Sequence, residues 1–229
     1  IYVPNDSDTE GEANFEIRFS DLAGNEGTPI TASTNNTKVI FDKTPPADFI
    51  VGLLTPTGGN QVDGMWNLTN TGMDIIIPVA NDTTLKNGTV QLYGKVGSNS
   101  FEVLGSISTI LSYEINANKI ISVSGTLIEG LTGFSEGQRI YVKAVMSDRP
   151  GNITEGSQSI IEILIDETPA SITPISILSS NNNTALAKVG DTVSVSFTTS
   201  ENLIDTAATI SGQNAIITSL GGNQFVAVY

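Results

Sequence analysis

The side chains best suited to chemistry are the carboxylates and amides of a turn motif that occurs twice. The motif Ser-Asp-x-x-Gly-Asn covers residues 20–25 and again residues 147–152. Each copy is followed by strand-forming residues that end at an Asp-x-Thr-Pro step, at residues 42–45 and 166–169. Carboxylate, amide and backbone oxygens are the ligands that Ca²⁺ takes in proteins, so a calcium site is one interpretation of the motif.

A second interpretation of the motif is structural. Asp and Asn side chains hydrogen-bond the backbone of their own turn, and Gly adopts the positive φ that many turns need. This turn chemistry explains the motif without any ligand, and the sequence leaves both interpretations open. The repetition itself indicates that the chain is built from copies of one structural unit.

The common kinds of catalytic site have no candidate residues. The chain contains no His and no Cys, which excludes Ser-His-Asp and Cys-His nucleophilic sites, thiolate metal sites, disulfides and nearly all zinc chemistry. Paired Asp and Glu residues can hydrolyse glycosides, but no motif singles out such a pair. We therefore expect a protein that is not an enzyme.

The charge balance restricts the partners. The chain has 24 Asp and Glu against 10 Lys and Arg, a formal net charge of −14, so its surface repels the phosphates of nucleic acids and anionic lipids. No apolar stretch approaches the roughly 20 residues that a membrane-spanning helix needs. We expect neither nucleic-acid binding nor direct membrane insertion.

Short strand patterns position the repeated turns. Residues 14–19 alternate aromatic or aliphatic with charged side chains, which is the period of a strand with one buried face. Similar segments follow one another through residues 47–166, with a turn after about every 8 to 12 residues, which predicts an all-β immunoglobulin-like β-sandwich. The expected strands are 49–54, 61–67, 73–80, 89–97, 101–106, 120–127, 139–147 and 159–165, with one helical turn at 127–131.

The Asp-x-Thr-Pro steps divide the chain into three parts. Proline stiffens each joint, because it fixes φ and restricts the residue before it. We expect residues 1–44 to be the C-terminal part of an Ig-like domain, residues 45–168 a complete sandwich, and residues 169–229 the N-terminal part of a following domain. The last strand would continue into the first when copies are written head to tail, so we interpret the chain as one period of a longer tandem array.

This division places the oxygen-rich residues at joints between domains. In an immunoglobulin sandwich, two of the loops lie beside the linker from the preceding domain, and together they offer the roughly six to eight oxygens that Ca²⁺ requires. The first expected calcium site consists of Asp42, Asp82, Asp148 and Asn152. The second joins Asp166 and Glu167 to Glu201, and Asp21 would serve a joint before residue 1.

The only Trp of the chain, Trp66, also has two interpretations. An exposed indole ring is a platform on which sugars stack. A buried one is a large apolar side chain in the core of a sandwich, where aromatic residues dominate the packing. We expect the second.

Several segments resemble a known family. Residues 186–201, and the motif residues 19–25 with 41–46, resemble bacterial Ig-like tandem repeats of giant cell-surface adhesins. Residues 66–72 and 78–82 are similar to a companion repeat in such arrays. Gliding-motility adhesins exported by type IX secretion carry arrays of this kind. The resemblance covers nearly the whole chain and implies an extracellular location at a bacterial cell surface.

The resemblance implies a filament or stalk that displays a distal binding region. Its partners would be the neighbouring repeats of the same polypeptide, with surface polysaccharide or substratum bound through regions outside this chain. A carbohydrate-binding or spacer module of a secreted hydrolase is the alternative function, and a self-associating surface-layer protein is a third. The flanking sequence distinguishes them, because only a stalk would continue into many further repeats.

Overall fold

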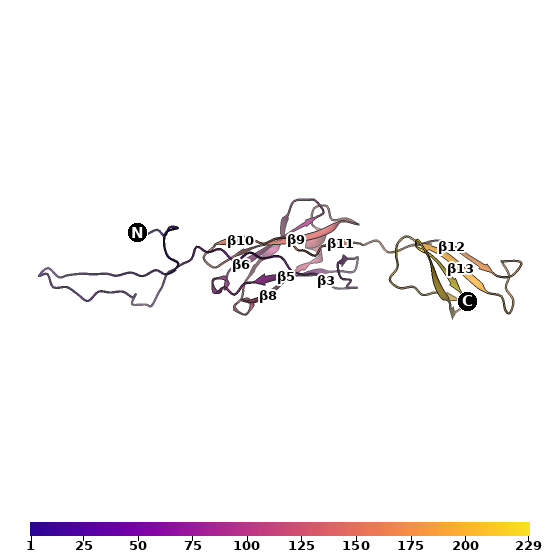
Figure 1. The fold of residues 1–229 in the computed structure, drawn as a ribbon, viewed down its shortest axis with the longest axis horizontal. Coiled ribbons are helices and arrows are strands. Elements are labelled where there is room, and N and C mark those ends of the chain that lie inside the picture. The colour runs from indigo at the N-terminus through magenta and orange to yellow at the C-terminus, as the bar shows by residue number, and fades with distance from the viewer. The chain divides into compact units, whose positions relative to one another are not determined.

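The computed structural model describes all of residues 1–229. Its regular structure consists of strands in five sheets, with one five-residue α-helix and two short 3-10 helices, which confirms the all-β prediction. The chain forms two compact units, residues 1–167 and residues 168–229, and each is described by itself (Figure 1). None of its helices has the length and apolar character that spanning a membrane requires.

The larger sheet of the first unit has six strands. In spatial order they are β4 (Met65–Trp66), β11 (Ile163–Ile165), β9 (Arg139–Ser147), β6 (Thr89–Val96) and β7 (Glu102–Thr109), and β10 (Ile153–Glu155) also pairs with β9. Every pair is antiparallel except β4 with β11. In β6 and β9 every second residue is buried, which is the alternation that predicts these two strands.

The smaller sheet has three antiparallel strands in the order β3 (Leu54–Thr57), β5 (Gly72–Val79) and β8 (Ala117–Ser124). The middle strand contains Pro78, which has no N–H to give to a neighbour. The pairing with β3 covers only residues 72–75 of β5, so Pro78 lies where no β3 partner is present. Proline is therefore tolerated in a strand that is central over only half of its length.

The core lies between these two sheets, which form a β-sandwich. Apolar side chains from both sheets and from the segments that connect their strands are buried in one cluster. Its largest fully buried members are Trp66, Met73, Ile75, Ile77, Leu85, Leu92, Leu104, Ile110, Ile128, Ile140, Met146 and Ile163. Trp66 packs edge-on against Phe134, with ring centroids 6.4 Å apart and an interplanar angle of 88°. The core interpretation of Trp66 is thus confirmed and the sugar-platform interpretation is wrong, because no face of the indole reaches solvent.

Several strand predictions need correction. The strand predicted at 159–165 begins only at Ile163, as β11, and the strand predicted at 101–106 continues to Thr109, as β7. Residues 49–53 form no continuous strand, because this segment crosses between sheets: Val51 bonds to Ser157 beside the larger sheet and Gly52 to Ile76 in the smaller one. The strand predicted at 61–67 shrinks to β4. The strand predicted at 120–127 ends at Ser124, and α1 (Gly125–Glu129) follows, two residues earlier than the predicted helical turn.

The first 44 residues contain little regular strand. β1 (Gly11–Glu12) pairs with β2 (Ile40–Phe41), and two isolated antiparallel bridges, Ile17 with Ile30 and Ser20 with Glu26, lie between them and the turn at residues 21–25. We call residues 11–41 the N-terminal hairpin. The alternation at 14–19 predicts a full strand here, but a two-stranded ribbon with no third strand or covering layer makes only a broken ladder.

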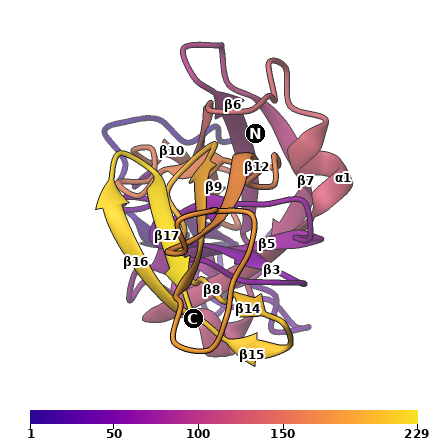
Figure 2. The same cartoon turned by 90° about the vertical axis from the view of Figure 1, so that its right-hand side faces the viewer.

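The second unit contains a four-stranded antiparallel sheet in the order β12 (Ile172–Ser179), β13 (Val193–Thr199), β17 (Gln224–Val228) and β16 (Ile216–Gly221). We call it the C-terminal sheet. A small hairpin of β14 (Thr209–Ile210) and β15 (Gln213–Asn214) belongs to the same unit. Figure 2 shows β16 beside β17, and the β14–β15 hairpin below them.

Candidate functional site at the joints

The second copy of the turn motif is built by Asp148, a buried residue with 3% of its surface exposed. Its Oδ1 accepts the backbone N–H groups of Gly151 (2.8 Å) and Asn152 (2.7 Å). Its Oδ2 accepts the side-chain amide of Asn152 (2.8 Å), and the backbone N–H of Asp148 donates to the Asn152 carbonyl (3.0 Å). Both oxygens of this carboxylate therefore take part in turn chemistry.

The first copy repeats this network around an exposed residue, Asp21. Its Oδ1 accepts the backbone N–H groups of Ala23 (2.9 Å) and Asn25 (2.8 Å), and its Oδ2 accepts the Asn25 amide (2.8 Å). The Asp21 N–H donates to the Asn25 carbonyl at 3.0 Å, as in the other copy. The hydrogen bonds from the Asn25 side chain, and then from backbone N–H groups, hold the pKa of Asp21 below its usual value.

One difference between the copies follows from proline chemistry. Ala23 donates its N–H to Asp21, but the matching residue of the second copy is Pro150, which has no N–H. Gly151 supplies that donor instead, with a positive φ of 109° that Gly adopts without a side-chain clash. The two turns therefore have the same hydrogen-bond network, except that one backbone donor comes from the next residue along the chain in the second copy.

The Asp-x-Thr-Pro steps also share a hydrogen bond, which sequence reasoning missed. The residue after each Asp donates its backbone N–H to a Glu carboxylate: Lys43 to Glu10 and Glu167 to Glu136, both at 2.9 Å. Each Glu is followed by Gly, at 10–11 and at 136–137, so a repeated Glu-Gly pair was the available signal. Hydrogen bonds from the Thr44 hydroxyl and then the Lys43 N–H lower the pKa of Glu10.

The segments carrying the first predicted calcium site contact one another. The Asn152 amide donates to the Asp42 carbonyl (3.3 Å), which joins the β9–β10 loop to the linker. The Arg149 N–H donates to the Thr84 carbonyl (3.0 Å), which joins that loop to η1 (Thr83–Leu85). A Cβ on Gly88 would lie 2.3 Å from the Ser147 carbonyl oxygen, so the close approach of these loops requires Gly.

The carboxylates of this predicted site differ in how many of their oxygens accept hydrogen bonds. Asp82 caps η1, and its Oδ1 accepts the backbone N–H (2.8 Å) and hydroxyl (2.6 Å) of Thr84. Asp42 Oδ1 accepts the Thr44 N–H (3.1 Å), whereas its Oδ2 is buried and has no hydrogen-bond partner. No group of three or more acidic side chains comes together as a metal centre. The feature that fits a cation is the orphaned Asp42 oxygen, and the calcium site stays a prediction.

The residues of the second predicted site belong to different units. In the first unit, the Asp166 N–H donates to the Trp66 carbonyl (2.8 Å) and the Glu167 N–H to Glu136. In the second unit, the carbonyl of Glu201 accepts the Thr199 hydroxyl (2.6 Å). The contacts of these three residues within their own units therefore run through backbone groups.

A surface patch on the outer face of the six-stranded sheet was not expected from the sequence. We call Tyr93, Lys95, Phe101, Tyr141 and Lys143 the aromatic–lysine patch. Its two ammonium groups lie over the ring of Phe101, at 4.9 Å and 4.8 Å from the centroid, and each also lies within 6 Å of a Tyr ring, at 5.2 and 5.8 Å. Such cation–π contacts add modest stability at exposed sites. The signal was a Tyr-x-Lys pattern in both β6 and β9.

Acidic neighbours bind two side chains of the aromatic–lysine patch. Lys143 pairs with Glu155 (2.7 Å), and the Tyr141 hydroxyl donates to Glu162 (2.7 Å). That hydrogen bond, with burial and the charge of Glu162, raises the pKa of Tyr141. The ring faces are covered by lysine side chains, so a sugar would have to displace these before it could stack.

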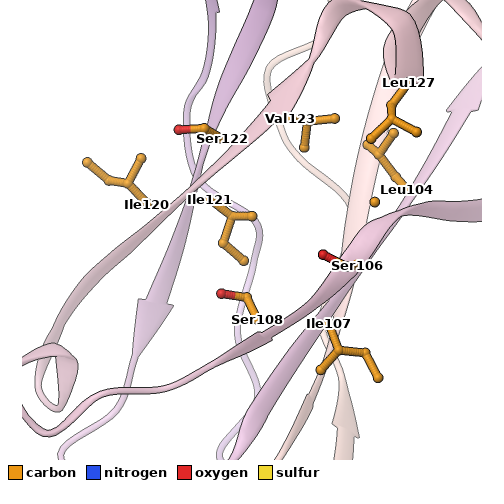
Figure 3. Close-up of a pocket in the computed structure, with 10 residues that line it drawn as sticks. Leu104, Ser106, Ile107, Ser108, Ile120, Ile121, Ser122, Val123 and Leu127 are labelled. Carbon is orange, nitrogen blue, oxygen red and sulfur yellow. The ribbon is translucent and has the colours of Figure 1, made fainter.

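The groove between β7 and β8 has a volume of about 310 Å³ (Figure 3). These are the outer strands of the two sheets, and the groove lies where the sandwich is open at its side. Its walls are Leu, Ile, Val, Gly and Ser, with Ile121 and Ser106 facing each other across it. None of these side chains titrates near neutral pH, so the groove offers no acid, base or metal ligand.

Comparison with known proteins does not assign the chain: no family model matches it, and no curated protein sequence matches it.

Proposed function

We propose that the chain is a non-catalytic repeat segment of a large extracellular adhesin or filament stalk, which extends a binding region from a bacterial surface. A gliding-motility adhesin exported by type IX secretion is the specific form that we favour. The sandwich of residues 45–167 is then an immunoglobulin-like repeat. What supports this type is its two-layer architecture, in which the first, third and sixth strands (β3, β5 and β8) form one sheet and the other strands form the second.

The observation that carries this proposal is the repetition of two hydrogen-bond networks. The Asp turn recurs at Asp21 and Asp148, and the Glu-bonded step recurs at Lys43 and Glu167. We interpret each turn, together with the joint after it, as the place where one repeat ends and the next begins. Arrays of this kind lengthen by copying units, because each unit contacts only its neighbours.

The function suggested is mechanical. The proline that ends each Asp-x-Thr-Pro step restricts the joint. Two positions before that proline, the backbone N–H of Lys43 or Glu167 donates to a Glu carboxylate, which fixes the chain as it enters the joint. A stalk built from such joints sets the reach of whatever it carries without binding a ligand in each repeat.

Surface labelling of intact cells tests this function. Antibodies raised against residues 1–229 should label non-permeabilised bacteria, and external protease should remove the signal. Labelling that appears only after permeabilisation would contradict an extracellular stalk. The native gene should also encode further Ser-Asp-x-x-Gly-Asn copies at the same spacing, whereas a neighbouring domain with paired catalytic carboxylates would favour the hydrolase accessory.

The aromatic–lysine patch supports the second candidate, a carbohydrate-binding module of a secreted hydrolase. Three rings on one sheet face are the kind of surface on which sugar rings stack. Binding to insoluble polysaccharides, compared between the native chain and a Tyr93→Ala/Tyr141→Ala variant, tests it. Retention of the native chain alone would favour this candidate over the stalk.

Calcium at the joints is a separate proposal. The buried Asp42 oxygen without a partner would be a ligand. Asp148 and Asn152 lie on the loop that contacts the linker, and Asp82 caps η1, which contacts that loop. Bound Ca²⁺ would supply positive charge that links the linker to these loops. The thermal unfolding temperature of residues 1–229 should then rise with Ca²⁺ and fall with chelator, and Asp42→Asn should remove that response. A melt that chelator leaves unchanged would reject the site.

A further inference from the structure

Two parallel pairings occur in the sandwich of the first unit, and its other strand pairs are antiparallel. The first joins the segment that enters the sandwich to the segment after β10. The Ser157 N–H donates to the Phe49 carbonyl (2.9 Å), and the Val51 N–H donates to the Ser157 carbonyl (3.1 Å). The bridge at this point is parallel. We call the contacts of residues 46–51 with residues 154–157 the entry pairing.

The second parallel pairing joins β4 to β11, the strand through which the chain leaves the sandwich. The Leu164 N–H donates to the Gly64 carbonyl (2.9 Å), and the Asp166 N–H donates to the Trp66 carbonyl (2.8 Å). Trp66 and Ile165 lie opposite each other in this pairing, and both are fully buried. Moving β11 along β4 would therefore expose the core to water as well as break backbone hydrogen bonds. We call these contacts the exit pairing.

The entry and exit pairings lie at opposite ends of β9. At the entry, the Thr154 hydroxyl donates to the Pro46 carbonyl, and Thr154 pairs with Met146, the last residue but one of β9. At the exit, Leu164 pairs with Arg139, the first residue of β9. Tension applied through the two joints of the sandwich therefore runs along its strands.

Strand direction determines how tension acts on these pairings. When one strand of a parallel pair is pulled at its start and its neighbour at its end, the strands slide along each other and all of their hydrogen bonds are loaded together. Residues 46–51 are pulled at their start by the joint before them. Residues 154–157 continue through their end to β11, which is pulled at its own end by the joint after it. Both pairings are therefore loaded in shear.

We propose that the entry and exit pairings together form a shear clamp, which keeps the sandwich folded when the chain is stretched between residues 45 and 167. The clamp acts on the rate of unfolding, which is the quantity that governs unfolding under force. Its role rests on the proposed stalk function, because a stalk is the setting in which the chain is stretched. The clamp is measured on the purified chain, so its failure and a failure of the surface labelling are distinguishable.

Single-molecule pulling on the 229-residue chain in two directions tests the proposal. The chain contains no Cys, so two introduced Cys residues fix where the handles attach. Handles at Pro45→Cys and Glu167→Cys load both pairings in shear. Handles at Leu68→Cys and Glu167→Cys pull on the ends of β4 and β11 that lie side by side, so the exit pairing opens one bond at a time. The sandwich should unfold at a clearly higher force in the first direction, and equal forces in the two directions would overturn the proposal.

A pair of proline variants tests the entry pairing by itself. Ser157→Pro removes the N–H that donates to Phe49, so the lifetime of the sandwich at constant force in the shear direction should shorten about fivefold, the effect of losing one hydrogen bond. Its lifetime in the other direction should not change. Gln158→Pro is the matched control, because Gln158 is the exposed next residue and its N–H donates no hydrogen bond, so it should behave like the native chain in both directions.

Fluorescence of Trp66 during thermal unfolding should show that each variant starts from a folded sandwich. A Ser157→Pro lifetime that shortens equally in both directions, or no more than that of Gln158→Pro, would mean that the entry pairing resists no force, and the clamp would be rejected. If Ser157→Pro does not fold, the comparison of the two pulling directions still decides, because it needs no proline variant.

Discussion

The sheet of β3, β5 and β8 and the sheet of β12, β13 and β17 share an antiparallel strand order, but only the first has a second sheet packed over its apolar face. In the covered sheet Ile75 and Ile77 are fully buried, whereas in the uncovered sheet Ile175 and Ile177 are mostly exposed. The difference shows that strand pattern determines which face is apolar, while a second layer determines whether that face contributes to stability.

The largest effect is expected at a buried ion pair found only in the covered sandwich. Lys119 Nζ lies 3.0 Å from both Glu114 oxygens and also donates to the Thr109 carbonyl (2.9 Å). Lys119→Met would leave the Glu114 charge buried without its partner and should cost about 3–5 kcal/mol of unfolding free energy in urea. Adding Glu114→Gln removes that charge and should recover most of the loss. If the single variant costs no more than the double, the pair does not matter for stability.

The next effect compares matched residues of the two sheets. Leu54 in β3 and Ile177 in β12 occupy the first strand of each sheet, opposite Ile75 and Val195. Leu54→Ala should cost about 2–5 kcal/mol because it opens a cavity in the core. Ile177→Ala should cost within about 0.5 kcal/mol, because this side chain is mostly exposed. Equal costs would mean that the C-terminal sheet is covered in solution.

A smaller effect is expected at the repeated turns. Asp148→Ala leaves the N–H groups of Gly151 and Asn152 without their acceptor in a partly buried loop, which should cost about 1–3 kcal/mol in urea unfolding. Asp21→Ala should leave the main unfolding transition unchanged, because the same network there is exposed to water. Faster amide exchange at Asn25 would be its only signature. A shift of the main transition by Asp21→Ala would contradict this separation.

The smallest effect is a pH dependence of the first turn. Hydrogen bonds lower the pKa of Asp21 in the folded chain, so its stabilisation is fully present above the unfolded value of about 3.9. It is lost as pH falls through the lower, folded pKa. The Asn25 amide resonance should therefore titrate with a midpoint below that of an Asp in an unfolded peptide. Asp21→Asn should remove the titration, and a midpoint at or above the peptide value would refute the prediction.

The sequence predicts best those strands whose two faces differ strictly. β5, β6 and β9 lie within one residue of the predicted ends, because every second side chain along them enters the core. The buried position of Trp66 was also predictable from its size. The loops of the first predicted site contact one another, although the sequence does not show how far their carboxylates are used by their own turns.

Other features depend on contacts that a single sequence does not reveal. Lys119 and Glu114 look like surface residues and become buried only because they pair. The sequence of the segment before β3 predicts a strand, but this segment crosses between the sheets: its residues bond first beside the larger sheet and then to the smaller one. The N-terminal hairpin has the alternation of a strand, yet its ladder is broken because no layer covers it. The alternation of apolar residues predicts which side chains lie on the apolar face of a strand. Whether that face is buried depends on a second layer that packs against it.

Because Trp66 is buried, it is an intrinsic fluorescence probe of the sandwich. It is the sole Trp, and its indole is surrounded by the apolar core with no hydrogen bond to the ring nitrogen. Its fluorescence should be blue-shifted while the sandwich is folded and should move to the red when water enters. Because neither the N-terminal hairpin nor the C-terminal sheet contains a Trp, this emission reports one region alone. Unfolding experiments on the chain can therefore follow the sandwich by itself through the emission wavelength of Trp66, without any added dye.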